Sequence, residues 1–539
     1  MTTNNFKDTL KKIKRILKRE LVGLWIFSVL LGLALIALSN KNKLPLERGD
    51  FAFISLLALL FALYRPRWIF FLLLSAIPLE NIILTGTFLP IQLRPYQFLE
   101  VILAVAVAIL YISKKLKFKI LKPNWLDWLI FSLWPLSFLS FLNSPVKSVS
   151  LKNNLVLLSF VVLYFLIRNF LRERSDLAKA TFFFLGSFLV VLFYGFYQVF
   201  AEKFGARSFE VMFGRPNSTF AEPDWLGIFL NFALAILLTI VLFEVKSRVV
   251  KFALYLMIFL DLILLILTLS RSAWVGAAAV IIFWLLFSLY KKDKAGTTFT
   301  PRKFFDKFVA ISLILLISLI AIRLGKLSKF DVFDRFRSTA TSEQKITIAC
   351  DKNGNIPASI ENMDELLKYN CRHINLEEIN FYKSQGKIVT EIFRQDPNIL
   401  TRSAIYQKSW EIIKTHPIFG VGFGTITQKL GSDERGTGLN ESNLFLQIWA
   451  GTGILGLIFF LLIIGSLFIH SFRSLSPICP LNKFFGCPIV KDNFEKLACL
   501  FAVLAIIALI IPNLFNAGLF LGIFWLGLAA FVSIKEVKN

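Results

Sequence analysis

The feature that most constrains this chain is a series of apolar runs, each about as long as a membrane crossing requires. A helix crosses the roughly 30 Å of membrane hydrocarbon with about 20 apolar residues. Such runs lie near residues 22–39, 50–64, 68–84, 97–113, 125–142, 152–171, 178–200, 225–243, 251–269, 272–290, 306–324, 443–469, 495–512 and 516–534. The sequence therefore predicts an all-α polytopic membrane protein with about fourteen transmembrane helices.

The composition supports this fold class and excludes a large soluble domain. Hydrophobic residues make up 56% of the 539 residues, and the mean hydropathy is +0.67. The formal net charge of +25 is high enough to suggest nucleic acid, but Lys and Arg occur in short clusters between the apolar runs. This pattern is typical of cytoplasmic loops that face anionic lipid headgroups. Membrane lipids are the expected partners, and nucleic acid is not.

The basic clusters also predict the orientation of the chain. If every run crosses the membrane, all of the clusters fall on one side, which is then the cytoplasmic side. Both termini are predicted to be cytoplasmic. The clusters are Lys11 to Arg19, Arg65 with Arg67, Lys114 to Lys122, Arg168 to Arg174, Lys246 to Lys251, Lys291 to Lys307, and Lys535 to Lys538.

This topology divides the chain into transmembrane residues 1–324, an extracytoplasmic loop domain at 325–442, and transmembrane residues 443–539. The loop is too long for a simple connection and is expected to fold on its own, mostly as helices. Lys345 to Cys350 has the pattern of a strand, and Asn353-Gly354 that of a hairpin turn. Cys350 and Cys371 can pair if the loop faces an oxidising compartment, and two free thiols are the alternative.

Three arginines are predicted to lie on the exported side, against the usual bias of positive charge. Arg215 lies in the segment 214–224, Arg271 in a very short connection between two apolar runs, and Arg402 in a polar helix. A guanidinium group can bind two phosphate oxygens at once, so these residues are candidates to hold a phosphate. The alternative for Arg215 is an ordinary loop charge. For Arg271 it is a side chain that reaches the lipid headgroups, and for Arg402 a solvated helix start.

Carboxylates near these arginines can take a proton from a hydroxyl group or neutralise an arginine. They are Glu222, Asp224 and Glu441. No phosphate-binding glycine loop, no nucleophile elbow and no metal-ligand spacing occurs, so neither a metal nor a cofactor is predicted.

The turn from His416 to Gly424 precedes the last large transition into the membrane. Pro417 cannot continue a helix, and the three glycines at 420, 422 and 424 allow a tight turn. They let the backbone approach a ligand or another helix closely, or they form a flexible linker. The long apolar run that follows opens on Glu441-Ser442-Asn443.

The order of these motifs resembles the O-antigen ligase and O-antigen polymerase superfamily. The resemblance rests on Arg215-Pro-Asn-Ser-Thr-Phe-Ala-Glu-Pro-Asp224, Leu269-Ser-Arg-Ser-Ala-Trp274, the His416–Gly424 turn, and Ser442-Asn443 with Gly453 and Gly456 downstream. In the ligases the last motif begins with His, where this chain has Ser442, preceded by Glu441. Because serine is a poor base at neutral pH, Glu441 takes over proton abstraction or the chain is a polymerase-like member with another arrangement.

The resemblance implies metal-independent transfer of glycan from an undecaprenyl-diphosphate-linked donor to a glycan or lipid acceptor. The reaction would take place at the outer face of the bacterial cytoplasmic membrane, alongside other polysaccharide-assembly membrane proteins. The residues it implies are Glu441, Arg271 and Arg215 for catalysis, and Arg402, Ser442, Asn443, Glu222 and His416 for substrate binding.

Several functions remain open within and beyond this class. A polymerase, a ligase and a protein O-glycosyltransferase share the same skeleton. A transporter or flippase for a lipid-linked glycan, without transferase chemistry, is the alternative from another class. Transporters usually place ionisable residues in the middle of broken spans, whereas the candidate charges here gather at one face, which favours an enzyme.

The topology predicts that residues 325–440 are accessible from outside the cell. Cysteines introduced at Ser338 and Ser432 should be labelled from outside intact cells. Labelling that requires permeabilisation would overturn both the topology and the enzyme interpretation.

Overall fold

The computed structural model describes two compact units, one of residues Met1–Leu327 with Glu411–Asn539 and one of residues Ser328–Trp410. Within the chain it describes residues 19–539 except 90, 202–203, 213, 243–246, 294–295, 300, 336–342, 352–355, 357, 362, 376–377, 396, 432–438, 476–492 and 537–539. The predicted Asn353-Gly354 turn, the basic cluster before Arg19, Cys479, Cys487 and the labelling positions Ser338 and Ser432 lie outside the described residues.

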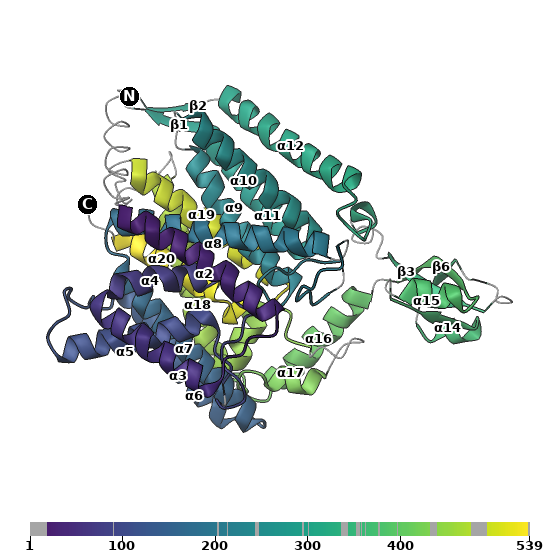
Figure 1. The fold of residues 1–539 in the computed structure, drawn as a ribbon, viewed down its shortest axis with the longest axis horizontal. Coiled ribbons are helices and arrows are strands. Elements are labelled where there is room, and N and C mark those ends of the chain that lie inside the picture. Colours follow the sequence, from purple (N-terminus) through teal and green to yellow (C-terminus); the bar gives the residue numbers. More distant parts are fainter. Residues whose placement is uncertain are drawn as a thin grey trace. The chain divides into compact units, whose positions relative to one another are not determined.

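The larger unit is built from long apolar helices (Figure 1). In hydrocarbon every backbone polar group needs a partner within the protein, and a helix supplies these partners locally. The apolar helices are α2 (Arg19–Asn40), α3 (Arg48–Tyr64), α4 (Pro66–Ala76), α5 (Pro95–Ile112), α6 (Trp125–Leu142), α7 (Lys147–Phe170), α8 (Arg174–Ala201), α9 (Pro223–Leu242), α10 (Arg248–Leu267), α11 (Arg271–Ser288), α12 (Pro301–Leu324), α18 (Leu444–Leu475), α19 (Asn493–Asn513) and α20 (Gly522–Glu536).

This arrangement confirms the predicted class, a polytopic all-α membrane protein, and each predicted run contains a helix. Among the described residues, 11 helices are long and apolar enough to cross a membrane. The shorter helices are α3, α4 and α20, so the predicted count of fourteen stays a prediction. The run predicted at 68–84 ends as a helix at Ala76, two residues before Pro78, because proline interrupts helical hydrogen bonding.

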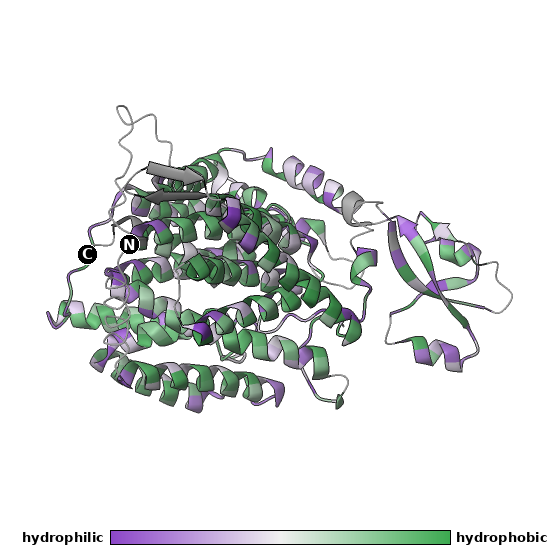
Figure 2. Cartoon of the chain, turned by 90° about the horizontal axis from the view of Figure 1, so that it is seen from above, coloured by the Kyte–Doolittle hydropathy of each residue, from purple (hydrophilic) through white to green (hydrophobic). Residues whose placement is uncertain are grey.

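Figure 2 shows hydrophobic residues along most of the length of these helices. Many large apolar side chains point out of the unit, for example Phe53 at 63% exposed and Phe252 at 69%. In water such a surface would be costly, whereas in a bilayer it faces lipid. The interior is filled by aromatic rings, such as Phe160 stacked on Trp525 with ring centroids 5.8 Å apart.

Two further features of the larger unit were not predicted. Strands β1 (Tyr290–Asp293) and β2 (Gly296–Phe299) form an antiparallel pair between α11 and α12, where the sequence showed only a basic cluster. A 3-10 helix, η3 (Gly518–Phe520), precedes α20.

The smaller unit has a four-stranded sheet at its core, in the order β4-β6-β3-β5. The strand predicted at 345–350 is confirmed as part of β3 (Glu343–Cys350), which lies antiparallel to β6 (Ile388–Gln395) and to β5 (Cys371–His373). The next strand, β4 (Ser359–Ile360), pairs with β6 instead of folding back on β3, so the expected hairpin partner is wrong. Helix α14 (Glu365–Lys368) packs on β5 and helix α15 (Ile379–Ser384) on β6. Helix α16 (Pro397–Ile413) follows β6 in the chain and ends in the larger unit. The smaller unit thus contains more strand than the sequence indicated.

Cys350 and Cys371 form a disulfide within this sheet. The two residues are paired in the register of β3 with β5, and both are buried beside Ile348 and Ile392. A disulfide persists in an oxidising compartment. Of the two alternatives, the structure shows the disulfide and not two free thiols. This pairing is consistent with the predicted extracytoplasmic position of the smaller unit.

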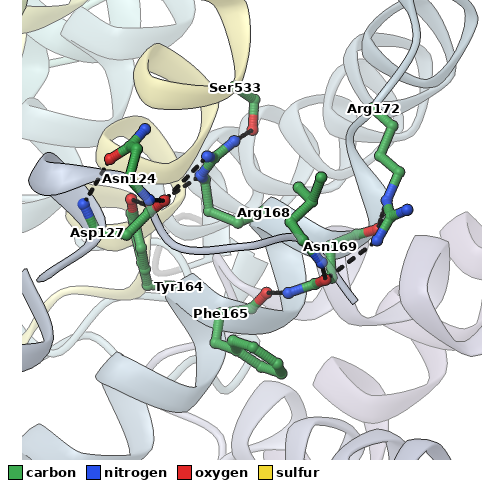
Figure 3. Close-up of polar contacts among 9 residues, drawn as sticks. Asn124, Asp127, Tyr164, Phe165, Arg168, Asn169, Arg172 and Ser533 are labelled. Carbon is green, nitrogen blue, oxygen red and sulfur yellow. Dashed lines mark hydrogen bonds and ion pairs between the residues drawn. The ribbon is translucent and has the colours of Figure 1, made fainter. Parts of the chain in front are cut away.

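A buried ion pair fastens three helices of the larger unit together (Figure 3). Arg168 on α7 donates from Nε to Oδ1 of Asp127 at 3.0 Å and from Nη2 to Oδ2 at 3.1 Å. The hydroxyl group of Tyr164 also donates to this carboxylate, and Nη1 of Arg168 donates to Ser533 on α20. Asp127 and Asn124 accept hydrogen bonds from each other's backbone N–H groups and so cap α6. We call Asp127, Tyr164, Arg168 and Ser533 the clamp.

Arg168→Met should lower the free energy of unfolding by about 3–5 kcal/mol, because it leaves a buried carboxylate without its cation. The double variant with Asp127→Leu should recover much of this loss. Thermal unfolding in detergent measures both. Arg174→Gln, which removes a partner of Glu495 in an ion pair whose side chains are 25% and 32% exposed, is the matched control and should cost at most about 1 kcal/mol. Equal losses in Arg168→Met and the control would contradict this role of the clamp.

Candidate functional site

The segment that carries Arg215 is held in one conformation by buried hydrogen bonds. Asn217, Ser218 and Thr219 are all fully buried. Oε1 of Gln198 on α8 accepts from the backbone N–H groups of Asn217 and Ser218, and the Thr219 hydroxyl donates to the Pro78 carbonyl at 2.6 Å. Ser218 has a φ of 48°, a conformation that persists only where the surroundings impose it. The loop is therefore a rigid support rather than a mobile connection.

Arg215 is fixed at both ends of its guanidinium group. Its Nε donates to the backbone carbonyl of Thr268 at 2.9 Å, and its Nη2 lies 3.7 Å from Oδ2 of Asp224, the second residue of α9. The Arg215 side chain is 16% exposed. The group is thus pre-oriented at the end of α10, where its charge is only partly screened by water.

Arg271 lies three residues beyond that carbonyl, as the first residue of α11. The tight connection depends on Leu269, with a φ of 54°, and on Ser270, whose hydroxyl accepts from the backbone N–H of Ala273. Arg271 is half-buried. Two of the predicted arginines are therefore brought to the same turn between α10 and α11.

A polar bridge connects this turn to the start of α18. The side-chain amide of Asn516 donates to the Ser272 hydroxyl at 3.0 Å, next to Arg271. Two residues earlier, the Leu514 carbonyl accepts from the side-chain amide of Asn443 at 3.0 Å. The connection between α19 and η3 thus joins the α10–α11 turn to the segment that contains Glu441.

Glu441 is a buried carboxyl group, 2% exposed, three residues before α18 begins. Burial raises its pKa above the ordinary carboxyl value, and a hydrogen bond from its own backbone N–H opposes this rise in part. A raised pKa makes the ionised carboxylate a stronger base. Such a group in a polar cluster is a candidate for proton transfer.

The two residues after Glu441 shape the backbone. Ser442 adopts a φ of 47°, and its N–H donates to the side-chain carbonyl of Asn440 at 2.9 Å. Oδ1 of Asn443 accepts from the N–H groups of Phe445 and Leu446. The cap of α18 is therefore Asn443 and not Glu441, which leaves the carboxyl group of Glu441 outside the capping role.

The glycine-rich turn packs on a break in α18. Gly453 leaves helical geometry, with a φ of 71°, and a Cβ atom there would lie 2.0 Å from the Ile418 carbonyl oxygen. The Ala450 carbonyl accepts instead from the N–H groups of Val421 and Gly422. Of the three interpretations of this turn, close approach to another helix is the one observed.

The remaining predicted residues lie at various places. Glu222 is half-buried just before α9, two residues from Asp224, and His416 is exposed where its ring contacts Thr415. Arg402 lies on α16 in the smaller unit, and its position relative to the arginines of the larger unit is not defined. Among the described residues no group of three or more His, Cys, Asp or Glu has the arrangement of a metal site.

Several polar residues of this region escaped the sequence reasoning. Asn516 and Gln198 are neutral amides, so a search for charged residues does not find them. The sequence signal for Asn516 is its place in the short break Asn513–Gly518 between two apolar runs. Asp261 is fully buried in α10, two helical turns before Thr268, and neither of its oxygens has a hydrogen-bond partner among the described residues. The sequence signal for Asp261 was an acidic residue inside an apolar run, which is uncommon in a transmembrane helix.

One comparison with known proteins bears on the class of this chain. Residues 254–461 match the family model described as O-antigen ligase. This match supports the O-antigen ligase and polymerase superfamily that the motifs predicted. The match includes Arg271, Glu441 and Asn443, and the Arg215 segment lies before it. The search of curated proteins and the search of solved structures found no match.

Proposed function

We propose that this protein transfers glycan from an undecaprenyl-diphosphate-linked donor to an acceptor hydroxyl at the outer face of the bacterial cytoplasmic membrane. The family supports a glycosyltransferase of the O-antigen ligase and polymerase type. The observation that carries the proposal is the meeting of Arg215 and Arg271 at one turn, with a polar bridge to the Glu441 segment.

Arg215 and Arg271 hold the diphosphate of the donor in this proposal. As the anomeric carbon separates from the diphosphate oxygen, negative charge grows on the leaving group. Guanidinium groups already fixed in a partly buried site stabilise this charge without reorganisation. The first turns of α9 and α11 lie beside them, and helix N-termini favour anions in the same way.

Glu441 accepts the proton of the acceptor. The acceptor oxygen forms a bond to the anomeric carbon, the bond to the diphosphate oxygen breaks, and the hydroxyl proton passes to the carboxylate. Burial supports this role because a carboxyl group with a raised pKa holds that proton more strongly than an ordinary one. Ser442 and Asn443 then serve the backbone that positions Glu441, and Glu222, His416 and Arg402 remain candidates for contacts with the glycan.

Arg215→Ala and Arg271→Ala should each reduce turnover by about 10²- to 10³-fold, the usual cost of removing a donor to a developing negative charge. Lysine should restore little, because a point charge lacks the two-pronged contact. The measurement is release of undecaprenyl diphosphate from a purified lipid-linked glycan by protein in lipid vesicles, with and without added acceptors.

Arg207→Ala is the matched control, since Arg207 lies in the same predicted external segment but outside the site. It should retain normal turnover. Wild-type activity in both Arg215→Ala and Arg271→Ala would refute their assignment to the diphosphate. Movement of intact donor across the vesicle membrane without release of the carrier would favour a flippase.

Glu441→Gln should reduce turnover by about 10²- to 10⁴-fold, because it keeps shape but removes the proton acceptor. Ser442→Ala should cost much less, although alanine must also adopt the positive φ at this position. In the wild-type protein the rate should fall as pH drops through the raised pKa of Glu441, since protonation removes the base. This inflection should disappear in Glu441→Gln.

The reverse order, with Ser442→Ala the more damaging, would assign Glu441 to pairing with an arginine. Ser442→His separates the two family types. A gain of transfer to an added acceptor would identify a ligase relative, and no gain would favour a polymerase.

A further inference from the structure

A second buried ion pair lies in the connection between α4 and α5, which the proposed mechanism does not use. Nη1 of Arg94 donates to Oε2 of Glu80 and to the hydroxyl group of Tyr96. Glu80 is 2% exposed, and the Arg94 side chain is 27% exposed. A carboxylate buried this deeply is costly unless its hydrogen bonds are satisfied. The connection lies on the same predicted exported side as Arg215 and Arg271.

The other oxygen of Glu80 holds the start of α20. Oε1 accepts from the backbone N–H of Gly522, the first residue of α20, at 2.9 Å. The first N–H groups of a helix have no partner within the helix, and a carboxylate is favoured there. The connection that ends at this hydrogen bond carries Asn516, whose amide donates to Ser272 beside Arg271. Glu80 therefore fixes one end of the polar bridge.

The residues on both sides of Glu80 hold the segment that carries Arg215. The Thr219 hydroxyl donates to the Pro78 carbonyl at 2.6 Å, and the N–H of Asn81 donates to the Thr219 carbonyl at 2.8 Å. Thr219 is fully buried, four residues after Arg215. The backbone just before and just after Glu80 thus fixes the end of this segment.

Two separate supports of the proposed site therefore meet at one carboxylate. The Arg215 segment is bonded to the neighbours of Glu80 in the chain, and the Asn516 connection is bonded to its Oε1. Arg94 holds Oε2 and so limits the movement of the side chain. A shift of Glu80 would change the position of Arg215 relative to Arg271, and a misplacement of about 1 Å can cost about 10²-fold in rate.

We propose that Glu80 is a positioning residue for glycan transfer, held by Arg94 and setting the spacing between the Arg215 segment and the Asn516 connection. This role rests on the proposed function, which assigns Arg215 and Arg271 to the diphosphate. Glu80 acts through these arginines and touches neither donor nor acceptor. Its loss should lower kcat more than it raises the KM for the donor, because misaligned guanidinium groups lose most where charge grows on the leaving group.

The first test measures release of undecaprenyl diphosphate by the full-length protein in lipid vesicles. Glu80→Ala removes both contacts and should lower kcat by about 10²-fold with little change in KM. Glu80→Gln keeps an oxygen that can accept from Gly522 and should recover part of this loss. In a chain that already carries Arg215→Ala, Glu80→Ala should lower kcat by less than about tenfold, because changes that act through one network are not additive.

The second test does not depend on catalysis. Hydrogen exchange of the purified protein in detergent should be faster in Glu80→Ala at residues 214–222 and 516–522, the two segments that Glu80 supports. Asp127→Ala is the matched control, because it breaks the buried ion pair of the clamp at the predicted cytoplasmic ends of α6 and α7. It should lower the Tm but leave kcat and the exchange of both segments unchanged.

Glu80→Gln with Arg94→Gln guards against loss of fold, because it replaces the ion pair with two neutral amides, and it should show the same pattern at smaller size. Unchanged exchange in both segments would overturn the proposal. So would an equal fall of kcat in Asp127→Ala, or the same fall for Glu80→Ala with and without Arg215. Full turnover in both Arg215→Ala and Arg271→Ala would refute the proposed function instead, and the exchange rates would still decide whether Glu80 holds the two segments.

Discussion

The break in α18 at Gly453 is the constraint on which the proposed site depends. A helix that crosses hydrocarbon cannot leave carbonyl groups unpaired without a large penalty. Here the Ala450 carbonyl accepts from Val421 and Gly422 and from the Ser140 hydroxyl on α6. The glycine-rich turn thereby supplies the hydrogen-bond donors that the broken helix lacks at this point. The start of α18, with Glu441, is held against a rigid neighbour rather than at the end of a flexible loop.

A second set of bonds connects residues that are far apart in the chain. Arg215 is bound to the carbonyl of Thr268, and the Asn516 amide to Ser272, so the arginines and the α18 start share one polar surface. The Thr268 carbonyl orients Arg215 without cancelling its charge, and the Asp224 carboxylate, 3.7 Å away, offsets part of it. In the proposed reaction the remaining positive charge stabilises the anionic leaving group.

The opposite ends of the helices use charge differently. In the clamp, Arg168 meets a carboxylate with two parallel hydrogen bonds and is almost fully buried. The Asp127 carboxylate neutralises its charge within the fold, whereas Arg172, four residues later, donates to the carbonyl and the side-chain amide oxygen of Asn169, which are neutral. Neighbouring arginines of one basic cluster thus have different kinds of partner, which the positive-inside pattern cannot distinguish.

The sequence alone determined the class of this protein, because apolar runs of about 20 residues leave helices as the economical way to satisfy the backbone in lipid. It also indicated the candidates Arg215, Arg271 and Glu441, because a charged residue beside apolar runs is costly unless it has a partner. Only the tertiary structure decided that Asn443 rather than Glu441 caps α18, that β4 pairs with β6, and that Asn516 joins two distant helix starts. These outcomes depend on which neutral donors and acceptors meet across the fold. A pattern of hydropathy and charge along one chain carries no information about such pairings.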